Sequence, residues 1–174
     1  MRVSIMALVV AALAVTACQD GPTSPHALSV NISPADDRST GDTPNYNLEV
    51  VLRGDGFGLV KFREPKNDDI AKRIYLDVWV RDLEPNTSYQ LQRATDTTLD
   101  GSCTGTNWIT LGQGAQPQSI VTDERGTGRA ELFRDVPAFP IGSSFDIHFR
   151  VIVANTTNPA VVVLMSGCYQ FTLR

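Results

Sequence analysis

The chain has 174 residues, with 13 glycines, 10 prolines, three cysteines and two histidines, and its formal net charge is −4. This length provides enough residues for one domain core after a leader, but not for a second domain. Because the basic residues are scattered, the sequence lacks the cationic footprint of a nucleic-acid-binding protein, and we expect no nucleic-acid partner.

Residues 1–17 have the pattern of an export signal. Arg2 gives a positive start, an apolar run follows over 5–15, and small residues precede Cys18. The run is shorter than the about 20 residues that a membrane-spanning helix needs. Its proportions and its small-residue end are typical of a cleaved signal peptide. We therefore expect residues 1–17 to be removed on export.

The tetrapeptide Val-Thr-Ala-Cys at 15–18 resembles the lipobox of bacterial lipoproteins. The resemblance implies a diacylglycerol on the Cys18 sulfur, cleavage before Cys18, and a further acyl chain such as palmitate on the new amino group. Two or more acyl chains together give stable membrane anchoring. Gln19, not Asp, comes next, which in such families implies outer-membrane sorting if the host has an outer membrane. The alternative is an ordinary secretory signal with a chance cysteine.

Residues 18–45 are rich in Pro, Ser, Thr, Asp and Gly. Such a composition buries too little apolar surface to offset the entropy of ordering, so it predicts a flexible tether from the membrane. The alternation of apolar and polar residues over 28–32 predicts one short edge strand within this segment.

Cys103 and Cys168 remain once Cys18 is assigned to the anchor. In an oxidising compartment two remaining thiols predict one disulfide. A catalytic or metal-binding pair is the alternative, but the two cysteines lie 65 positions apart, without a CxxC spacing or neighbouring histidines. The sequence therefore favours the disulfide.

From residue 46 onward apolar residues recur at every second position. The runs are Leu48–Leu52, Val60–Phe62, Ile74–Val80, Phe145–Val153 and Tyr169–Leu173. This period predicts strands with one buried face. Turn-forming clusters separate them at 54–56, 64–68, 123–126, 140–142 and 155–159. The pattern predicts an all-β domain over 46–174, a β-sandwich or barrel.

The run Leu83-Glu84-Pro85-Asn86-Thr87-Ser88-Tyr89 resembles the tyrosine corner of fibronectin type III and other immunoglobulin-like domains. The resemblance implies a Greek-key β-sandwich with a structural corner at Leu83, Pro85, Thr87 and Tyr89. The tyrosine hydroxyl would bond back to the corner backbone while its ring joins the core. Because the chain continues well past the corner, a Greek-key relative with extra strands is expected.

The same run, followed by a cysteine loop and a Gly-rich hairpin, is also loosely similar to Greek-key barrels of the copper-zinc superoxide dismutase type. Copper and zinc in that family need a cluster of histidines. Here His26 lies in the tether and His148 stands alone on a predicted strand. We therefore expect no such metal site and no cofactor.

No catalytic motif is found in the sequence: there is no Gly-x-Ser-x-Gly elbow, phosphate loop or H-E-x-x-H pair. His148 is expected to be exposed on the polar face of its strand. The acidic pairs at 68–69 and 123–124 lack the spaced ligands of a calcium loop. We expect a non-catalytic cell-envelope module that binds a protein or glycan partner or has a structural role. An envelope hydrolase with a loop-built site is the alternative.

Tyr75 and Trp79 fall on the polar side of the predicted strand 74–80. With His148 or Arg150 on an adjacent strand, they would form a flat aromatic platform for a sugar or protein. The alternative is that this side is covered, for example by the loop at 101–107 together with Trp108.

Overall fold

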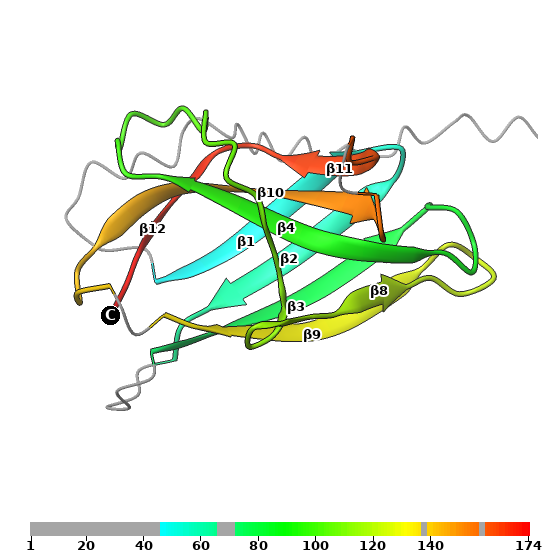
Figure 1. The fold of residues 1–174 in the computed structure, drawn as a ribbon, viewed down its shortest axis with the longest axis horizontal. Helices are drawn as coiled ribbons and strands as arrows, with labels where there is room; N and C mark the ends of the chain where they lie inside the picture. The colour runs from blue at the N-terminus through cyan, green and yellow to red at the C-terminus, as the bar shows by residue number, and fades with distance from the viewer. Residues whose placement is uncertain (1–45, 66–71, 137–138, 157–158) are drawn as a thin grey trace, which may run out of the picture. The chain divides into compact units, whose positions relative to one another are not determined.

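The computed structural model describes residues 46–65, 72–136, 139–156 and 159–174 (Figure 1). The expected signal peptide, Cys18, the tether and the short strand at 28–32 lie outside these residues. Within them no helix is long and apolar enough to cross a membrane.

The described part of the chain forms twelve β-strands, which confirms the all-β prediction. They are β1 (Asn47–Gly54), β2 (Phe57–Arg63), β3 (Arg73–Arg81), β4 (Ser88–Asp96), β5 (Ile109–Thr110), β6 (Gly112–Gln113), β7 (Gln116–Pro117), β8 (Ser119–Val121), β9 (Gly128–Asp135), β10 (Ser144–Val153), β11 (Val162–Ser166) and β12 (Tyr169–Thr172).

Strands β1, β2 and β3 form an antiparallel meander that follows the predicted alternation. Val50 lies opposite Val60, and Phe62 lies opposite Leu76, so apolar residues of successive strands meet on one face. All of these side chains are buried. Burial of this face is the main stabilising term, because each fully buried aliphatic or aromatic side chain contributes about 1.5–3 kcal/mol.

The twelve strands belong to one sheet that curves around a common interior and nearly closes (Figure 1). Its main path runs β5-β4-β10-β11-β1-β2-β3-β9-β6-β7, while β12 pairs with β10 and β8 pairs with β4 off this path. Only Leu111 separates β5 from β6, and these two short strands pair with β4 and β9. The segment 109–113 therefore joins the two sides of the sheet, and the buried Leu111 side chain joins the core there.

The strands β8 and β9 lie between β3 and β4 in the sheet. β3 pairs with β2 and β9, whereas the next long strand, β4, pairs with β10 and β8. β8 and β9 follow each other through the turn at 122–127, and Thr122 bridges Gly128. The hairpin β8–β9 therefore separates β3 from β4 in the sheet, although β4 is the next strand after β3 in the chain.

The corner at 83–89 is held against this hairpin by several hydrogen bonds. The Tyr89 hydroxyl accepts a hydrogen bond from the backbone N–H of Glu84 at 3.1 Å, and its ring is buried. Thr122 Oγ1 donates to the Glu84 carbonyl at 2.7 Å. The backbone N–H of Leu83 donates to the carbonyl of Gly126 at 3.2 Å.

The predicted disulfide between Cys103 and Cys168 is present, with the two Cα atoms 5.3 Å apart. Cys103 lies in the connection from β4 to β5, which we call the cysteine loop (97–108), and Cys168 lies between β11 and β12. The disulfide therefore ties the cysteine loop to the last hairpin of the chain.

Candidate functional site

The structure does not bring the four residues of the expected aromatic platform together. Tyr75 and Trp79 lie on β3, and His148 and Arg150 lie on β10. Strands β11, β1 and β2 separate β3 from β10 in the sheet. The prediction of one platform is therefore wrong, because β3 pairs with β2 and β9 instead of with β10.

On β3 the outward side chains form a mixed polar surface. Tyr75 is 40% exposed. The Trp79 ring meets Phe57 edge to face, with centroids 5.8 Å apart. Between them Asp77 forms a two-pronged ion pair with Arg129 of β9. The two aromatic rings are therefore separated by a charged pair and do not form a continuous apolar surface.

His148 is buried, so the expectation that it is exposed is wrong. The cysteine loop covers it: His148 Nε2 is 3.1 Å from the carbonyl oxygen of Gly105, and the Trp108 ring lies 4.5 Å from the imidazole. The Arg150 guanidinium lies over the same Trp108 ring, 4.1 Å from its centre. The loop cover that the sequence offers as an alternative for β3 is thus found over β10.

Polar groups of β4 and β10 hold the cysteine loop in place. The buried Asp146 carboxylate accepts hydrogen bonds from the backbone N–H groups of Asp100 and Gly101 at 3.1 and 2.7 Å. Asp96 accepts from the N–H of Gly105 at 2.9 Å. A hydrogen bond from a backbone N–H to a buried carboxylate is strong because the acceptor is charged. This layer is therefore a fixed structural cover.

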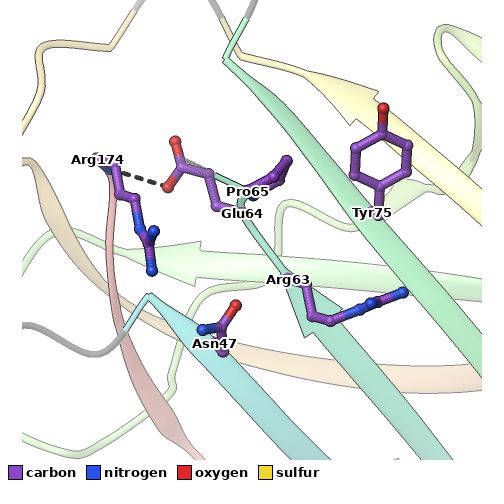
Figure 2. Close-up of a pocket in the computed structure, with 6 residues that line it drawn as sticks. All are labelled: Asn47, Arg63, Glu64, Pro65, Tyr75 and Arg174. Carbon is purple, nitrogen blue, oxygen red and sulfur yellow. Dashed lines mark hydrogen bonds between the residues drawn. The ribbon is translucent and has the colours of Figure 1, made fainter. Parts of the chain in front are cut away.

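An open pocket of about 450 Å³ lies where the strands end (Figure 2). Its lining comes from four parts of the fold: Asn47 of β1, Arg63, Glu64 and Pro65 at the end of β2, Tyr75 of β3, and Arg174 after β12. The Glu64 carboxylate accepts the backbone N–H of Arg174 at 2.9 Å, the contact drawn as a dashed line.

Glu64 is the buried acid of this pocket, with 3% of its surface exposed. Burial raises the pKa of its carboxyl group, and the hydrogen bond from Arg174 opposes that rise only in part. The Arg174 guanidinium itself lies over the Tyr46 ring at 4.5 Å.

A second pocket, of about 140 Å³, lies inside the sheet at one end. Core side chains of four strands line it: Phe62 of β2, Leu76 of β3, Ile147 of β10 and Phe171 of β12. Phe139 and Phe145, whose rings meet edge to face at 5.3 Å, lie at the same end.

Two arginines, Arg93 and Arg134, line this inner pocket as well. On β4, Arg93 comes two positions after the buried Leu91 and lies opposite the buried Phe149 of β10. Its side chain is therefore on the face of the strand that is directed into the core. On β9, Arg134 follows Leu132 in the same way and lies opposite Ile74.

No ion pair within the described residues includes Arg93 or Arg134. Arg93 Nη1 donates a hydrogen bond to Thr95 Oγ1 at 3.3 Å. Burial lowers the pKa of Arg93, and the like charge of Arg134 lowers it further. An arginine still keeps its proton in such a place. The pocket therefore combines an apolar wall with two cations that have no carboxylate partner in the part of the chain that the structure describes.

These two arginines are not among the site residues expected from the sequence. Sequence reasoning could have found them, because each is a charged residue at a position of its strand where the alternation predicts a side chain directed into the core. In the described part of the chain, no group of three or more His, Cys, Asp or Glu side chains is arranged to hold a metal ion. Comparison of the chain with protein-family models and with the sequences of curated proteins finds no match.

Proposed function

We propose that the chain is an exported bacterial lipoprotein, anchored to the cell envelope through acyl chains on Cys18, whose β-domain binds a partner without catalysing a reaction. The Cys103–Cys168 disulfide is the observation that carries this proposal. Structural disulfides form and persist in oxidising compartments such as the periplasm and the cell surface. The disulfide thus supports export independently of the lipobox sequence.

For the fold itself, we propose a Greek-key domain related to immunoglobulin-like sandwiches, with the sheet curled toward a barrel. The order β10-β4-β8-β9 supports this. With the short strands β5, β6 and β7 left aside, it is the 4-1-2-3 order of a Greek key. The bond from Glu84 N–H to the Tyr89 hydroxyl supports the resemblance to a tyrosine corner.

Binding is favoured over catalysis by the state of His148. A histidine base needs a ring nitrogen within reach of the group that it deprotonates. Here Nε2 lies against a backbone carbonyl under the cysteine loop, and the ring is buried. The alternative is an envelope hydrolase with an acid such as Glu64, one oxygen of which accepts the backbone N–H of Arg174.

The anchor is tested by expressing the full chain in a bacterial host that is fed an alkyne-labelled fatty acid. We expect label on the wild-type protein, recovery in the membrane fraction, and a mature N-terminus at Cys18. Cys18→Ala should lose the label, whereas Gln19→Ala should keep it. An intact Met1 or an unmodified Cys18 in the wild-type protein, found by mass spectrometry, would overturn the proposal.

Binding and hydrolysis are separated by mixing the purified lipoprotein with isolated cell-wall glycan. Co-sedimentation without release of soluble fragments would support a binding module. Release of fragments above the level of a boiled sample would support the hydrolase.

A further inference from the structure

The two inward arginines, Arg93 and Arg134, are half-buried and form no ion pair with an acid among the described residues. Charged side chains are almost never directed into a protein core without a partner, because an unpaired charge loses its hydration there. Arg93 and Arg134 come from two different strands and meet at one pocket. Two like charges repel, so their common location costs free energy unless an anion offsets it.

The walls of the inner pocket restrict the anion that it can accept. Phe62, Ile147 and Phe171 line the same space as the two arginines. Its volume of about 140 Å³ is close to that of an engineered apolar cavity of about 150 Å³ that binds benzene. The space therefore suits one ring or a short branched chain, and it is too small for a long acyl chain.

We propose that the inner pocket binds a small amphiphilic anion, an aryl or short-chain carboxylate, with its apolar group inside the sheet and its carboxylate between Arg93 and Arg134. Guanidinium groups match a carboxylate through paired N–H donors. The apolar group takes the place of water against the aromatic walls. This site is separate from the protein or glycan partner proposed above and does not depend on lipidation of Cys18.

The first test compares three probes by calorimetry on the full-length protein as purified from the bacterial host in detergent micelles, lipidated or not, with empty micelles as the blank. Benzoate carries both the ring and the charge, benzyl alcohol carries the ring alone, and acetate carries the charge alone. We expect benzoate to bind at least about tenfold more tightly than either of the other two, because charge-assisted hydrogen bonds add to burial of the ring. Equal affinity for benzoate and benzyl alcohol, or no binding of benzoate, would overturn the proposal.

The second test replaces each arginine by methionine, which has a similar length and no charge. Arg93→Met and Arg134→Met should each weaken benzoate binding at least about fivefold and leave benzyl alcohol binding nearly unchanged. Arg129→Met is the matched control, since Arg129 is on β9 but points outward to Asp77. A loss of the same size in Arg129→Met would contradict the assignment of the site.

Thermal unfolding of each variant shows whether it has folded. Should one of the two arginine variants fail to fold, the other variant and the probe comparison on the wild-type protein still decide the matter. The anchor experiment has a different readout, so failure of the ligand proposal and failure of the lipoprotein proposal are distinguishable.

Discussion

Thr122 donates a hydrogen bond from its Oγ1 to the carbonyl oxygen of Glu84 at 2.7 Å, although the two residues are 38 positions apart. The same oxygen accepts the backbone N–H of Thr87 at 3.0 Å. One hydroxyl therefore connects the β8–β9 hairpin to both ends of the corner that leads from β3 to β4. Thr122 is 2% exposed, so water cannot replace these bonds.

The substitution Thr122→Val removes the hydroxyl but keeps the branched shape. We expect it to lower the free energy of unfolding by about 1–3 kcal/mol, since it removes the hydroxyl that bonds to part-buried backbone groups of Glu84 and Thr87. Urea unfolding followed by circular dichroism measures this difference. Thr98→Val, at an exposed place in the cysteine loop, is the control and should change stability by less than about 0.5 kcal/mol. Equal effects of the two substitutions would refute this role of Thr122.

Tyr89 gives a second test of the corner. Its ring is 1% exposed and its hydroxyl accepts the Glu84 N–H. Tyr89→Phe keeps the ring and removes the acceptor, so we expect a loss of about 1 kcal/mol or somewhat more. Tyr75→Phe makes the same change at a side chain that is 40% exposed and should be nearly neutral. A Tyr89→Phe variant as stable as the wild type would show that the hydroxyl does not hold the corner.

Glycine can be required at a position because its φ is positive or because a Cβ would clash, and Gly126 and Gly142 distinguish these two reasons. Both have a positive φ, of 72° and 83°. A Cβ on Gly126 would lie 2.0 Å from the carbonyl oxygen of Leu83, whereas a Cβ on Gly142 would meet no atom within 4 Å. Gly142→Ala should therefore show only the backbone strain, about 1–2 kcal/mol. Gly126→Ala should lose clearly more stability, because the corner at 83–89 has to move away from the new Cβ. Thermal unfolding of both variants measures the difference. Equal losses of stability would contradict this steric argument.

The alternation of apolar residues predicts β1, β2, β3, β10 and β12, because each has one face in the core. The strands β4 and β9 are not identified by the same pattern. In β4 the inward series changes from Leu91 to Arg93, and in β9 it changes from Leu132 to Arg134. The two arginines that line the inner pocket are therefore the residues that interrupt the strand signal.

The errors in the candidate site have a different origin. Alternation tells which side chains share a face of one strand, but not which strands are neighbours in the sheet. The pairing of β10 with β4 and of β3 with β9 joins distant parts of the chain, so local pattern could not decide whether the expected platform forms. The alternation of β10 predicts an exposed His148, but a loop that begins at residue 97 covers it.

We expect the Cys103–Cys168 disulfide to stabilise the domain and to hold the cysteine loop over His148. Replacing Cys103 and Cys168 together by alanine should lower the free energy of unfolding by about 2–4 kcal/mol, because the open chain regains freedom in its unfolded state. The cysteine loop should also loosen, so that the tryptophan fluorescence, measured in a Trp79→Phe background to report Trp108 alone, shifts to longer wavelength at temperatures where the domain remains folded. The single variant Met165→Ala, exposed on β11, is the control. A double variant with unchanged Trp108 emission and unchanged stability would show that the loop is held by its polar contacts alone.

Glu64 is expected to make the protein less stable as the pH rises, whereas a solvated, ion-paired acid makes a protein less stable as the pH falls. Since burial raises the pKa of Glu64 above 4.5, the folded protein holds this proton more tightly than the unfolded chain does. Stability contributed by the protonated acid is therefore present below pH 4.5 and is lost as the pH rises through the raised pKa. Glu64→Gln keeps an oxygen that accepts the Arg174 N–H but does not titrate, so its stability relative to the wild type should increase between pH 4 and pH 7. Urea unfolding at both pH values measures this change, with the exposed Glu49→Gln as the control, which should stay within about 0.5 kcal/mol of the wild type at each pH. A constant difference between Glu64→Gln and the wild type over this range would mean that the buried carboxyl does not titrate differently on folding.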